Sequence, residues 1–287
     1  MSPNTLGALL MMASMACFTV NDTFIKMTAG AIPLFQLLFL RGAMTTALIL
    51  LYRNSLGRIH FNIARRDWGL IALRSLAEVG AAYFFLTALF NMPLANVTAI
   101  LQALPLCVTL AAALVFKEAV GVQRMAAILV GLIGVMLIVR PGTDGFSIWS
   151  IYALIAVLIV TVRDLATRRL SRDVPSMTVT MITAAVVMVA AGLASLTQPW
   201  AAVDATQGVL IAGSALFILG AYTFSIKVMR IGDVSFIAPF RYTGLVWALL
   251  LGLLVFGDWP DPLTLVGAGI VVASGLFTLY RERKLAR

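Results

Sequence analysis

The sequence predicts an all-α polytopic membrane protein in which ten transmembrane helices form two inverted five-helix repeats. Three observations lead to this fold class. First, 61% of the 287 residues are apolar and only 11% are charged, with a mean hydropathy of +1.01, whereas a soluble domain carries about 25% charged residues. Second, apolar runs of about 20 residues, enough to cross the hydrocarbon core of a bilayer, recur ten times. Third, the second half of the chain repeats features of the first half.

Turn-forming residues separate most of the predicted spans, because proline and glycine interrupt a continuing helix. The spans cover residues 5–27, 33–52, 68–90, 95–116, 121–139, 147–167, 175–197, 206–226, 234–256 and 262–280. Successive breaks contain Gly30 and Pro33, Asn91 and Pro93, Pro141 and Gly142, Pro175, Pro199, and Asp258 and Pro262. The breaks after the second, fourth and eighth spans are loops that contain Lys or Arg. This length leaves no room for a separate catalytic domain.

Basic residues indicate the orientation, because cytoplasmic loops retain an excess of Lys and Arg. With ten spans, fifteen Lys and Arg residues fall on the side that holds both termini, and only Lys26 and Arg140 fall on the other. We therefore expect a multi-pass protein of the bacterial inner membrane with both termini in the cytoplasm. The net charge of +9 does not indicate a nucleic-acid partner, because the basic residues are dispersed among short loops.

An internal repeat relates residues 1–140 to residues 141–287, which are the two expected domains. At offsets of 139 to 142, the aligned pairs include Thr19 with Thr161, Asp22 with Asp164, Pro33 with Pro175, Ser75 with Ser214, Tyr83 with Tyr222, and Phe116 with Phe256. Because five is odd, the second copy would enter the membrane from the opposite side, as in many alternating-access carriers. Chance resemblance between apolar helices is the alternative explanation.

Seven ionisable residues lie inside the predicted spans, where each costs about 2.5–3.5 kcal/mol near the centre of an isolated helix. They are Asp22, Arg41, Arg74, Glu78, Arg163, Asp164 and Arg241. Asp22 and Arg41 come about 8 and 12 Å from the outer end of the bundle, so we expect them to pair. Arg163 and Asp164 are close enough to a loop to reach water, which leaves a purely structural role open for both.

Glu78 is the deepest carboxylate, about 15 Å inside the third span. Arg74 is four residues earlier on the same helix face, so the two side chains could simply neutralise each other. The alternative is functional. Because desolvation penalises the ionised carboxylate, Glu78 would take up and release a proton during transport, with Arg74 and Asp164 as coupling partners.

Polar and aromatic residues at similar depths are candidates for binding a substrate, because ligand cavities combine apolar walls with a few polar groups. They are Asn21, Asp22, Gln36, Arg41, Tyr83, Thr98, Gln102, Tyr222, Arg241 and Tyr242. Packing or lipid contact is the alternative for each. Four intramembrane arginines against three carboxylates favour a substrate with an anionic or zwitterionic part. The sequence has no phosphate-binding GxxxxGK[ST] loop and no His or Cys cluster, so we expect no ATP drive, cofactor or metal.

Several motif residues extend along nearly the whole chain. They are Pro33, Arg41, Ala95, Pro105, Glu118, Gln123, Gly131 and Gly134 in the first half, and Pro239, Asp258 and Gly267 in the second. This pattern resembles the EamA family of the drug/metabolite transporter superfamily. The opening stretch, with Ser14, Met15, Phe18, Asn21, Asp22 and Lys26, is similar to a bacterial branch that includes riboflavin and S-adenosylmethionine carriers. The resemblance implies ten helices, an inverted repeat and a central substrate cavity.

The second repeat has Thr183 where the first has Arg41, so we expect an electrostatically asymmetric cavity. Together these features favour a secondary transporter that moves a small organic metabolite, riboflavin-like or amino-acid-like, through the lipid bilayer by alternating access, as a monomer or a homodimer. Export of amino acids or drugs is the alternative within the family. An intramembrane lipid-modifying enzyme would need a nucleophile and a base at one depth, and the only histidine, His60, lies in a loop. A passive channel is a further alternative.

Overall fold

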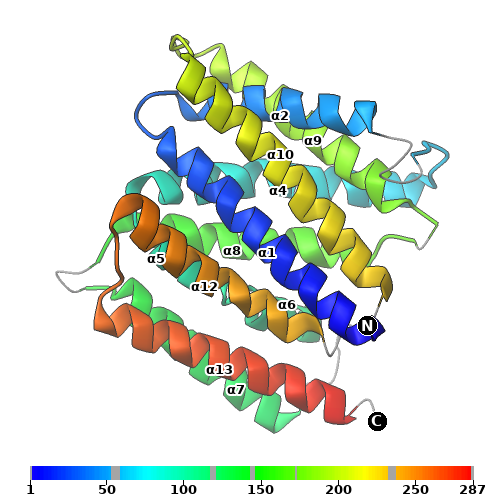
Figure 1. Cartoon of the computed structure of the whole chain (residues 1–287). Coiled ribbons are helices and arrows are strands. Elements are labelled where there is room, and N and C mark those ends of the chain that lie inside the picture. The colour runs from blue at the N-terminus through cyan, green and yellow to red at the C-terminus, as the bar shows by residue number, and fades with distance from the viewer. Residues whose placement is uncertain are drawn as a thin grey trace.

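The computed structural model describes residues 2–52, 59–116, 121–142, 146–171, 173–231 and 237–285, and every regular element in these ranges is helical. The first half contributes α1 (Pro3–Met27), α2 (Leu34–Leu51), α4 (Arg65–Asn91), α5 (Leu94–Leu101), α6 (Leu104–Phe116) and α7 (Val122–Val139). The second half contributes α8 (Ile148–Arg168), α9 (Ser176–Ser195), α10 (Ala205–Ile231), η1 (Ala238–Tyr242), α12 (Thr243–Leu251), η2 (Gly252–Phe256) and α13 (Pro262–Leu285). The helices form one bundle with both chain ends on the same side (Figure 1).

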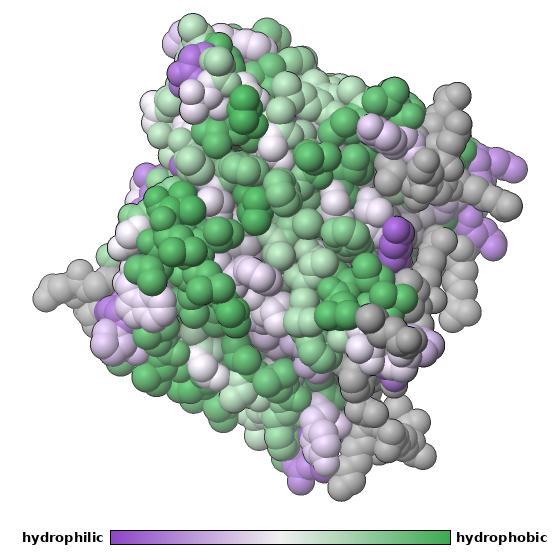
Figure 2. Space-filling view, viewed as in Figure 1, coloured by the Kyte–Doolittle hydropathy of each residue, from purple (hydrophilic) through white to green (hydrophobic). Residues whose placement is uncertain are grey.

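Ten helical segments of the described chain are long and apolar enough to span a membrane, which confirms the predicted polytopic helical fold. Two of them are composite. Leu94–Val115 combines α5 with most of α6, and Ala238–Phe256 combines η1, α12 and η2. Apolar side chains cover most of the face shown in Figure 2, and hydrophilic ones gather towards its edges. Such an apolar exterior suits contact with lipid chains.

Proline shapes two of the spans in different ways. In the fourth span, α5 ends at Leu101 and α6 begins at Leu104, because Pro105 lacks a backbone N–H and its ring would clash with the carbonyl group four residues earlier. Pro239 instead lies in the first turn of η1, where proline is tolerated. Glu118, one of the motif residues, lies outside the described residues.

Helices of the two halves pack against each other in pairs. α1 packs along α10, α2 along α9, α4 along α8, and α7 along α13. Each pair joins a helix of residues 1–140 to a helix of residues 141–287, so the two halves build one bundle. In chain order, α1, α2, α4 and α7 of the first half correspond to α8, α9, α10 and α13 of the second half. Exchanging corresponding helices turns the α1–α10 pair into the α8–α4 pair and leaves the α2–α9 and α7–α13 pairs unchanged.

Glycine residues bring α7 and α13 into backbone contact. A Cβ atom at Gly134 would lie 2.8 Å from the carbonyl oxygen of Gly267, and one at Gly267 would lie 2.6 Å from the carbonyl oxygen of Gly134. Gly131 and Gly275 also face neighbours that leave no room for a side chain. Gly269 has open space beside it, so it takes no part in this close approach.

Substitution of Gly134 or Gly267 by alanine is expected to destabilise the protein by about 1–3 kcal/mol, because the added methyl group must push the two backbones apart. Thermal unfolding of the purified protein in detergent measures this as a lower Tm. Gly269→Ala is the matched control and should leave the Tm unchanged or slightly higher, because alanine is a better helix former than glycine. Equal Tm values for all three variants would contradict close packing of α7 on α13.

Lys26 is one of the two basic residues on the predicted outer side, and it is held by the end of α4. Its Nζ atom donates hydrogen bonds to the carbonyl oxygens of Leu89 (3.0 Å) and Met92 (2.7 Å), where the helix dipole favours a cation. The same atom lies 5.4 Å from the ring centroid of Phe256 in η2. Lys26 therefore joins α1 and α4 of the first half to η2 of the second.

Arg140, the other outer-side cation, joins the end of α7 to the start of α13. It adopts the left-handed conformation after α7 (φ 52°) and forms an ion pair with Asp261. Asp261 caps α13 by accepting hydrogen bonds from the backbone N–H groups of Leu263 (3.0 Å) and Thr264 (3.1 Å). Both exceptions to the charge bias thus have structural partners.

Asp261 lies outside the membrane-spanning segments and should make stability depend on pH. Burial alone would raise the pKa of Asp261, but hydrogen bonds from Thr264 and Arg140 outweigh it and hold the pKa below its usual value. A carboxylate with a depressed pKa in the folded state contributes stability above about pH 3.9, and this contribution is lost as the pH falls through the folded pKa. Asp261→Asn is therefore expected to lower the Tm at pH 7, by about 1 kcal/mol or less in stability, and to lower it less at pH 3. A decrease of the same size at both pH values would contradict this effect.

Candidate functional site

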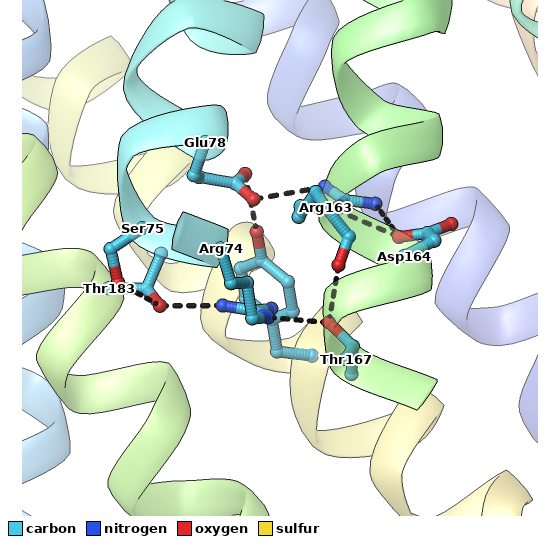
Figure 3. A network of polar contacts seen from close by, with 8 residues as sticks. Arg74, Ser75, Glu78, Arg163, Asp164, Thr167 and Thr183 are labelled. Atoms are coloured by element: carbon cyan, nitrogen blue, oxygen red, sulfur yellow. Dashed lines mark hydrogen bonds and ion pairs between the residues drawn. The ribbon is translucent and has the colours of Figure 1, made fainter. Parts of the chain in front are cut away.

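A network of polar side chains lies inside the bundle (Figure 3). We define the polar network as Arg74, Ser75 and Glu78 of α4, Arg163, Asp164 and Thr167 of α8, Thr183 of α9, and Tyr222 of α10. Residues three and four positions apart share a helix face, which explains why α4 and α8 each present three members to the same region. Glu78 is the central residue of the 27-residue helix α4, whereas Thr167 lies one residue before the end of α8, so the network extends from near mid-membrane depth towards one end of the bundle.

Arg163 is the cation at the centre of the polar network. Its Nη1 atom donates to Oε2 of Glu78 at 3.0 Å, and its Nε and Nη2 atoms donate to Oδ1 of Asp164 at 2.9 and 2.8 Å. The side chains of Arg163 and Glu78 are only 18% and 17% exposed. One guanidinium group therefore neutralises two carboxylates that come from different helices.

Arg74 does not form the intrahelical ion pair with Glu78 that its spacing suggested. It donates instead to the hydroxyl groups of Thr167 (3.0 Å) and Thr183 (2.5 Å), and Ser75 lies 3.2 Å from Thr183. The reason is geometric. α8 brings the guanidinium group of Arg163 within 3.0 Å of the Glu78 carboxylate, whereas that of Arg74, on the same helix as Glu78, turns to the two hydroxyl groups. Arg74 nevertheless remains within electrostatic reach of Glu78.

Tyr222 extends the polar network towards α1. Its hydroxyl group donates to Oε1 of Glu78 at 3.4 Å, and its ring meets the ring of Phe18 edge-on, with centroids 5.5 Å apart. Arg41 of α2 interacts electrostatically with Tyr222, Asp22 and Glu78. Asp22 and Arg41, both predicted from the sequence, thus lie within electrostatic range of the polar network, but among the described residues neither forms a hydrogen bond or an ion pair with it.

Asn21, Asp22 and Arg41 form a second group, next to Tyr222. The Asn21 amide donates to Oδ1 of Asp22 at 2.9 Å. Asp22 and Arg41, which were expected to pair, lie within electrostatic range of each other. However, these two described residues form no ion pair within 4.0 Å.

Gln36 and Tyr83 lie apart from both groups. Gln36 is buried, and its amide exchanges two hydrogen bonds with the backbone of Ala201 (2.8 and 2.9 Å), which favours the structural alternative for this residue. Tyr83 stacks on Phe35 (5.9 Å between centroids, 14° between planes). It is 37% exposed at a shallow apolar pocket that Val79 also lines, between α2, α4 and α9.

The remaining candidates lie around the breaks in the fourth and ninth spans. Gln102 is buried after α5, close to the position of Gly244 in α12. The Tyr242 hydroxyl group is buried without a hydrogen-bond partner in the described structure. Neither Arg241 nor Thr98 has a side-chain hydrogen bond to the polar network in the described part of the chain.

Arg163, Thr167 and Thr183 were missed as binding or coupling candidates. Arg163 is recognisable in the sequence as a charge inside a predicted span, but because it lies near a loop, its side chain was expected to reach water. Thr183 has a different signal, because it aligns with Arg41 in the internal repeat. Among the described residues, no three His, Cys, Asp or Glu side chains are placed to hold a metal ion.

Comparison with protein families settles the class of this helical bundle. The sequence model of the EamA-like transporter family matches residues 5–140 and again residues 147–280. The chain belongs to this family. Membership confirms the resemblance seen in the sequence, and it confirms a multi-pass membrane transporter in preference to an enzyme.

Several proteins similar to this EamA-like chain have names that include a substrate. The riboflavin transporter of Vibrio cholerae is 28% identical over 287 residues, covering 98% of this chain and 95% of its own. The S-adenosylmethionine uptake transporter of Rickettsia prowazekii is 24% identical, covering 97% and 94%. The pseudopaline exporter of Pseudomonas aeruginosa is 26% identical, covering 97% of both chains. A known crystal structure covering 96% of this EamA-like chain and 99% of its own matches with a TM-score of 0.65 at 21% identity, which shows a shared fold.

Proposed function

We propose that this EamA-like protein is a secondary carrier that moves a small organic metabolite across the bacterial inner membrane by alternating access. The polar network is the observation that carries the proposal. Charged side chains inside a membrane are costly and usually mark a substrate or ion pathway. Here they come from helices of both halves and meet at the level of Glu78, where a substrate could be reached from either side.

Two observations support an inverted repeat of residues 1–140 and 141–287. The helix pairs keep their pattern when the halves are exchanged, and the family model matches each half separately. Two five-helix units of opposite orientation can exchange conformations and so open a central site to each side in turn. The charge bias of the loops supports cytoplasmic termini.

The distribution of charge refines the expected substrate. The polar network and its neighbours contain three arginines, Arg41, Arg74 and Arg163, and three carboxylates, Asp22, Glu78 and Asp164. The excess positive charge that favoured an anion is on Arg241, which has no hydrogen bond or ion pair with these groups in the described structure. The balanced site suits a substrate with no large net charge, and the names of the relatives support vitamins or amino-acid derivatives.

Counterflow in proteoliposomes tests the proposal. Vesicles loaded with an unlabelled candidate are diluted into the same labelled compound, with riboflavin, S-adenosylmethionine and each common amino acid tested in turn. A carrier accelerates uptake of label above the level of unloaded vesicles, because inward and outward movements share one site. Uptake that does not respond to internal compound would indicate a channel and would contradict alternating access.

Proton coupling through Glu78 is part of the proposal. When Glu78 takes up a proton, it would release Arg163, which Asp164 still neutralises at 2.8 Å. Glu78→Gln is therefore expected to flatten the pH dependence of transport, measured as initial uptake rates in proteoliposomes over a series of pH values. Asp173→Asn, at an exposed position outside the spans, is the control. Retained transport with an unchanged pH profile in Glu78→Gln would rule out this role.

A further inference from the structure

Two loops of the chain are held by the same kind of contact. The Gln36 side chain of α2 donates to the backbone carbonyl oxygen of Ala201 at 2.8 Å and accepts from its N–H group at 2.9 Å. The Thr178 hydroxyl group of α9 donates to the backbone carbonyl oxygen of His60 at 3.2 Å and accepts from its N–H group at 3.1 Å. Gln36 and Thr178 each lie three positions after a proline N-cap and align at an offset of 142. Each half therefore holds a loop of the other half by an equivalent residue.

These two loop contacts indicate which interactions persist when a carrier of this kind changes state. In an inverted-repeat carrier, the second state arises when the two halves exchange conformations, so each contact becomes its repeat counterpart. The loop contacts are counterparts of each other, and both are formed, so both persist in the second state. A contact whose counterpart is not formed behaves differently, because it breaks at one end of the bundle while its counterpart forms at the other.

Lys26 makes a contact of this second kind. Its Nζ atom donates hydrogen bonds to the carbonyl oxygens of Leu89 (3.0 Å) and Met92 (2.7 Å) at the end of α4, and it lies 5.4 Å from the ring centroid of Phe256. We call this set of contacts the outer latch, because it joins α1, α4 and η2 at the predicted outer end of the bundle.

The counterparts of the outer-latch residues lie at helix ends of the other half and of α6. Lys26 aligns with Arg168 at an offset of 142, and both are cations in the last turn of a helix. At offsets of 139 and 140, the partners of Lys26 align with Val228 and Ile231 at the end of α10 and with Phe116 at the end of α6. Arg168 has other contacts in this structure, but none of them is a hydrogen bond to the described carbonyl group of Val228. The bond from Lys26 to Leu89 is therefore formed without its counterpart.

We infer that Arg168 closes the inner end of the bundle in the opposite state, by donating to the carbonyl oxygens of Val228 and Ile231. The inference rests on the proposed carrier function and its inverted repeat. The last carbonyl groups of a helix have no partner within the helix, and the helix dipole favours a cation there. A guanidinium group has five N–H donors, so Arg168 can bond both carbonyl groups, as the Lys26 ammonium group does at the outer end.

Two opposed latches have a specific effect on the populations of the two states. Loss of the outer latch favours the outward-open state, and loss of the inner latch shifts the equilibrium back. Hydrogen bonds of charged groups are strong enough to change such an equilibrium at least tenfold. Lys26→Met combined with Arg168→Met should therefore have nearly the state populations of the unmodified protein. A cation that only directed membrane insertion would not restore them.

The distance between the inner ends of α8 and α10 measures these populations. Ser171 is exposed after α8, and its backbone N–H group is held by Asp67 of α4 at 3.1 Å. Lys227 is exposed near the end of α10. Double electron–electron resonance between spin labels at Ser171→Cys and Lys227→Cys, in liposomes and with Cys17 and Cys107 replaced by alanine, gives the distribution of this distance.

Lys26→Met is expected to raise the ratio of the shorter to the longer distance at least tenfold, and addition of Arg168→Met should return it to the ratio of the unmodified protein. Lys26→Met with Arg168→Lys should keep the shorter distance, because lysine forms the outer latch. Two further controls in the Lys26→Met background should also keep it. Arg66→Met removes an exposed cation from the start of α4, and Thr178→Val breaks a loop contact that both states share.

The outcomes separate the inference from the carrier function. A shorter distance that persists when Arg168→Met is added overturns the inference but upholds the carrier, since the inner ends still close without this residue. A reversal that Arg66→Met produces equally also overturns the inference, because any loss of cytoplasmic charge would then suffice. One unchanged distance in every background, with or without the compounds used for counterflow, overturns the inference and the carrier together.

Discussion

Replacement of Arg163 by methionine is expected to lower the free energy of unfolding by about 3–5 kcal/mol, the effect of breaking a buried ion pair. The guanidinium group holds Glu78 at 3.0 Å and Asp164 at 2.8 Å. Methionine fills much of the same space but leaves two intramembrane carboxylates without a counter-ion. Tyr222 would remain as a weak hydrogen-bond donor to Glu78 at 3.4 Å, which cannot replace a full charge. Thermal unfolding in detergent measures the loss.

Matched variants separate the ion pairs from simple packing. Asp164→Asn leaves the Glu78–Arg163 pair intact and should cost less than Arg163→Met. The triple variant with Glu78→Gln, Arg163→Met and Asp164→Asn removes all three charges of the ion-paired cluster and should recover much of the lost stability, because apolar or neutral replacement of a whole buried cluster is often tolerated. An Arg163→Met protein as stable as the unmodified protein would contradict a central role for this cation.

Lys26→Met is expected to loosen the outer end of the bundle. Lys26 donates two charge-assisted hydrogen bonds to the end of α4 and faces Phe256 of the other half. In the proposed alternating-access cycle, this end of the bundle separates when the central site opens outward. Because hydrogen bonds to charged groups contribute about 1.5–3 kcal/mol, and about 1.4 kcal/mol is a tenfold change in an equilibrium, the open state should become at least tenfold more populated.

Cysteine accessibility measures this population. Leu94 is fully buried in the apolar cluster that also contains Leu89, so Leu94→Cys should react slowly with an impermeant maleimide from outside. The rate should rise about tenfold with Lys26→Met and little with Lys26→Arg, in a chain whose Cys17 and Cys107 are replaced by alanine. Thr197→Cys, exposed after α9, controls for reagent access. Equal Leu94→Cys rates in all three backgrounds would contradict a closing role for Lys26.

Much of the architecture follows from local sequence. An apolar run of about 20 residues has to cross the membrane as a helix, since lipid offers no partner to an exposed backbone group. Proline and glycine positions then delimit the runs, and Pro105 even predicts an interruption within a span. Depth along a helix also follows from a rise of 1.5 Å per residue, so Glu78 could be placed near mid-membrane before any contact was known.

The partners of the charged residues could not be derived in the same way. Spacing on one helix suggested Arg74 for Glu78, yet the structure joins Glu78 to Arg163, 85 residues away. Which faces of two helices meet depends on the packing of the whole bundle, which residue spacing does not encode. Conversely, Gln36 and Asn21 were equally good candidates for binding a substrate from their depths alone. In the structure, however, the Gln36 side-chain amide forms two hydrogen bonds with the backbone of Ala201.

The differences between the two halves at the polar network also depend partly on sequence and partly on packing. Alignment of the two halves showed that Thr183 corresponds to Arg41. Only the packing of the helices shows the consequence. α9 packs against α4, which brings the Thr183 hydroxyl group within 2.5 Å of Arg74.

Composition and hydrophobic run length alone thus predicted a ten-span helical membrane protein, because the bilayer permits few other structures for such a chain. Tertiary packing decided which intramembrane charges form ion pairs and which, like Arg41 and Asp22, form none within 4.0 Å in the described structure. The reason is physical. Membrane insertion depends on each helix separately, whereas electrostatic pairing depends on distances of about 3 Å between helices that are far apart in the chain.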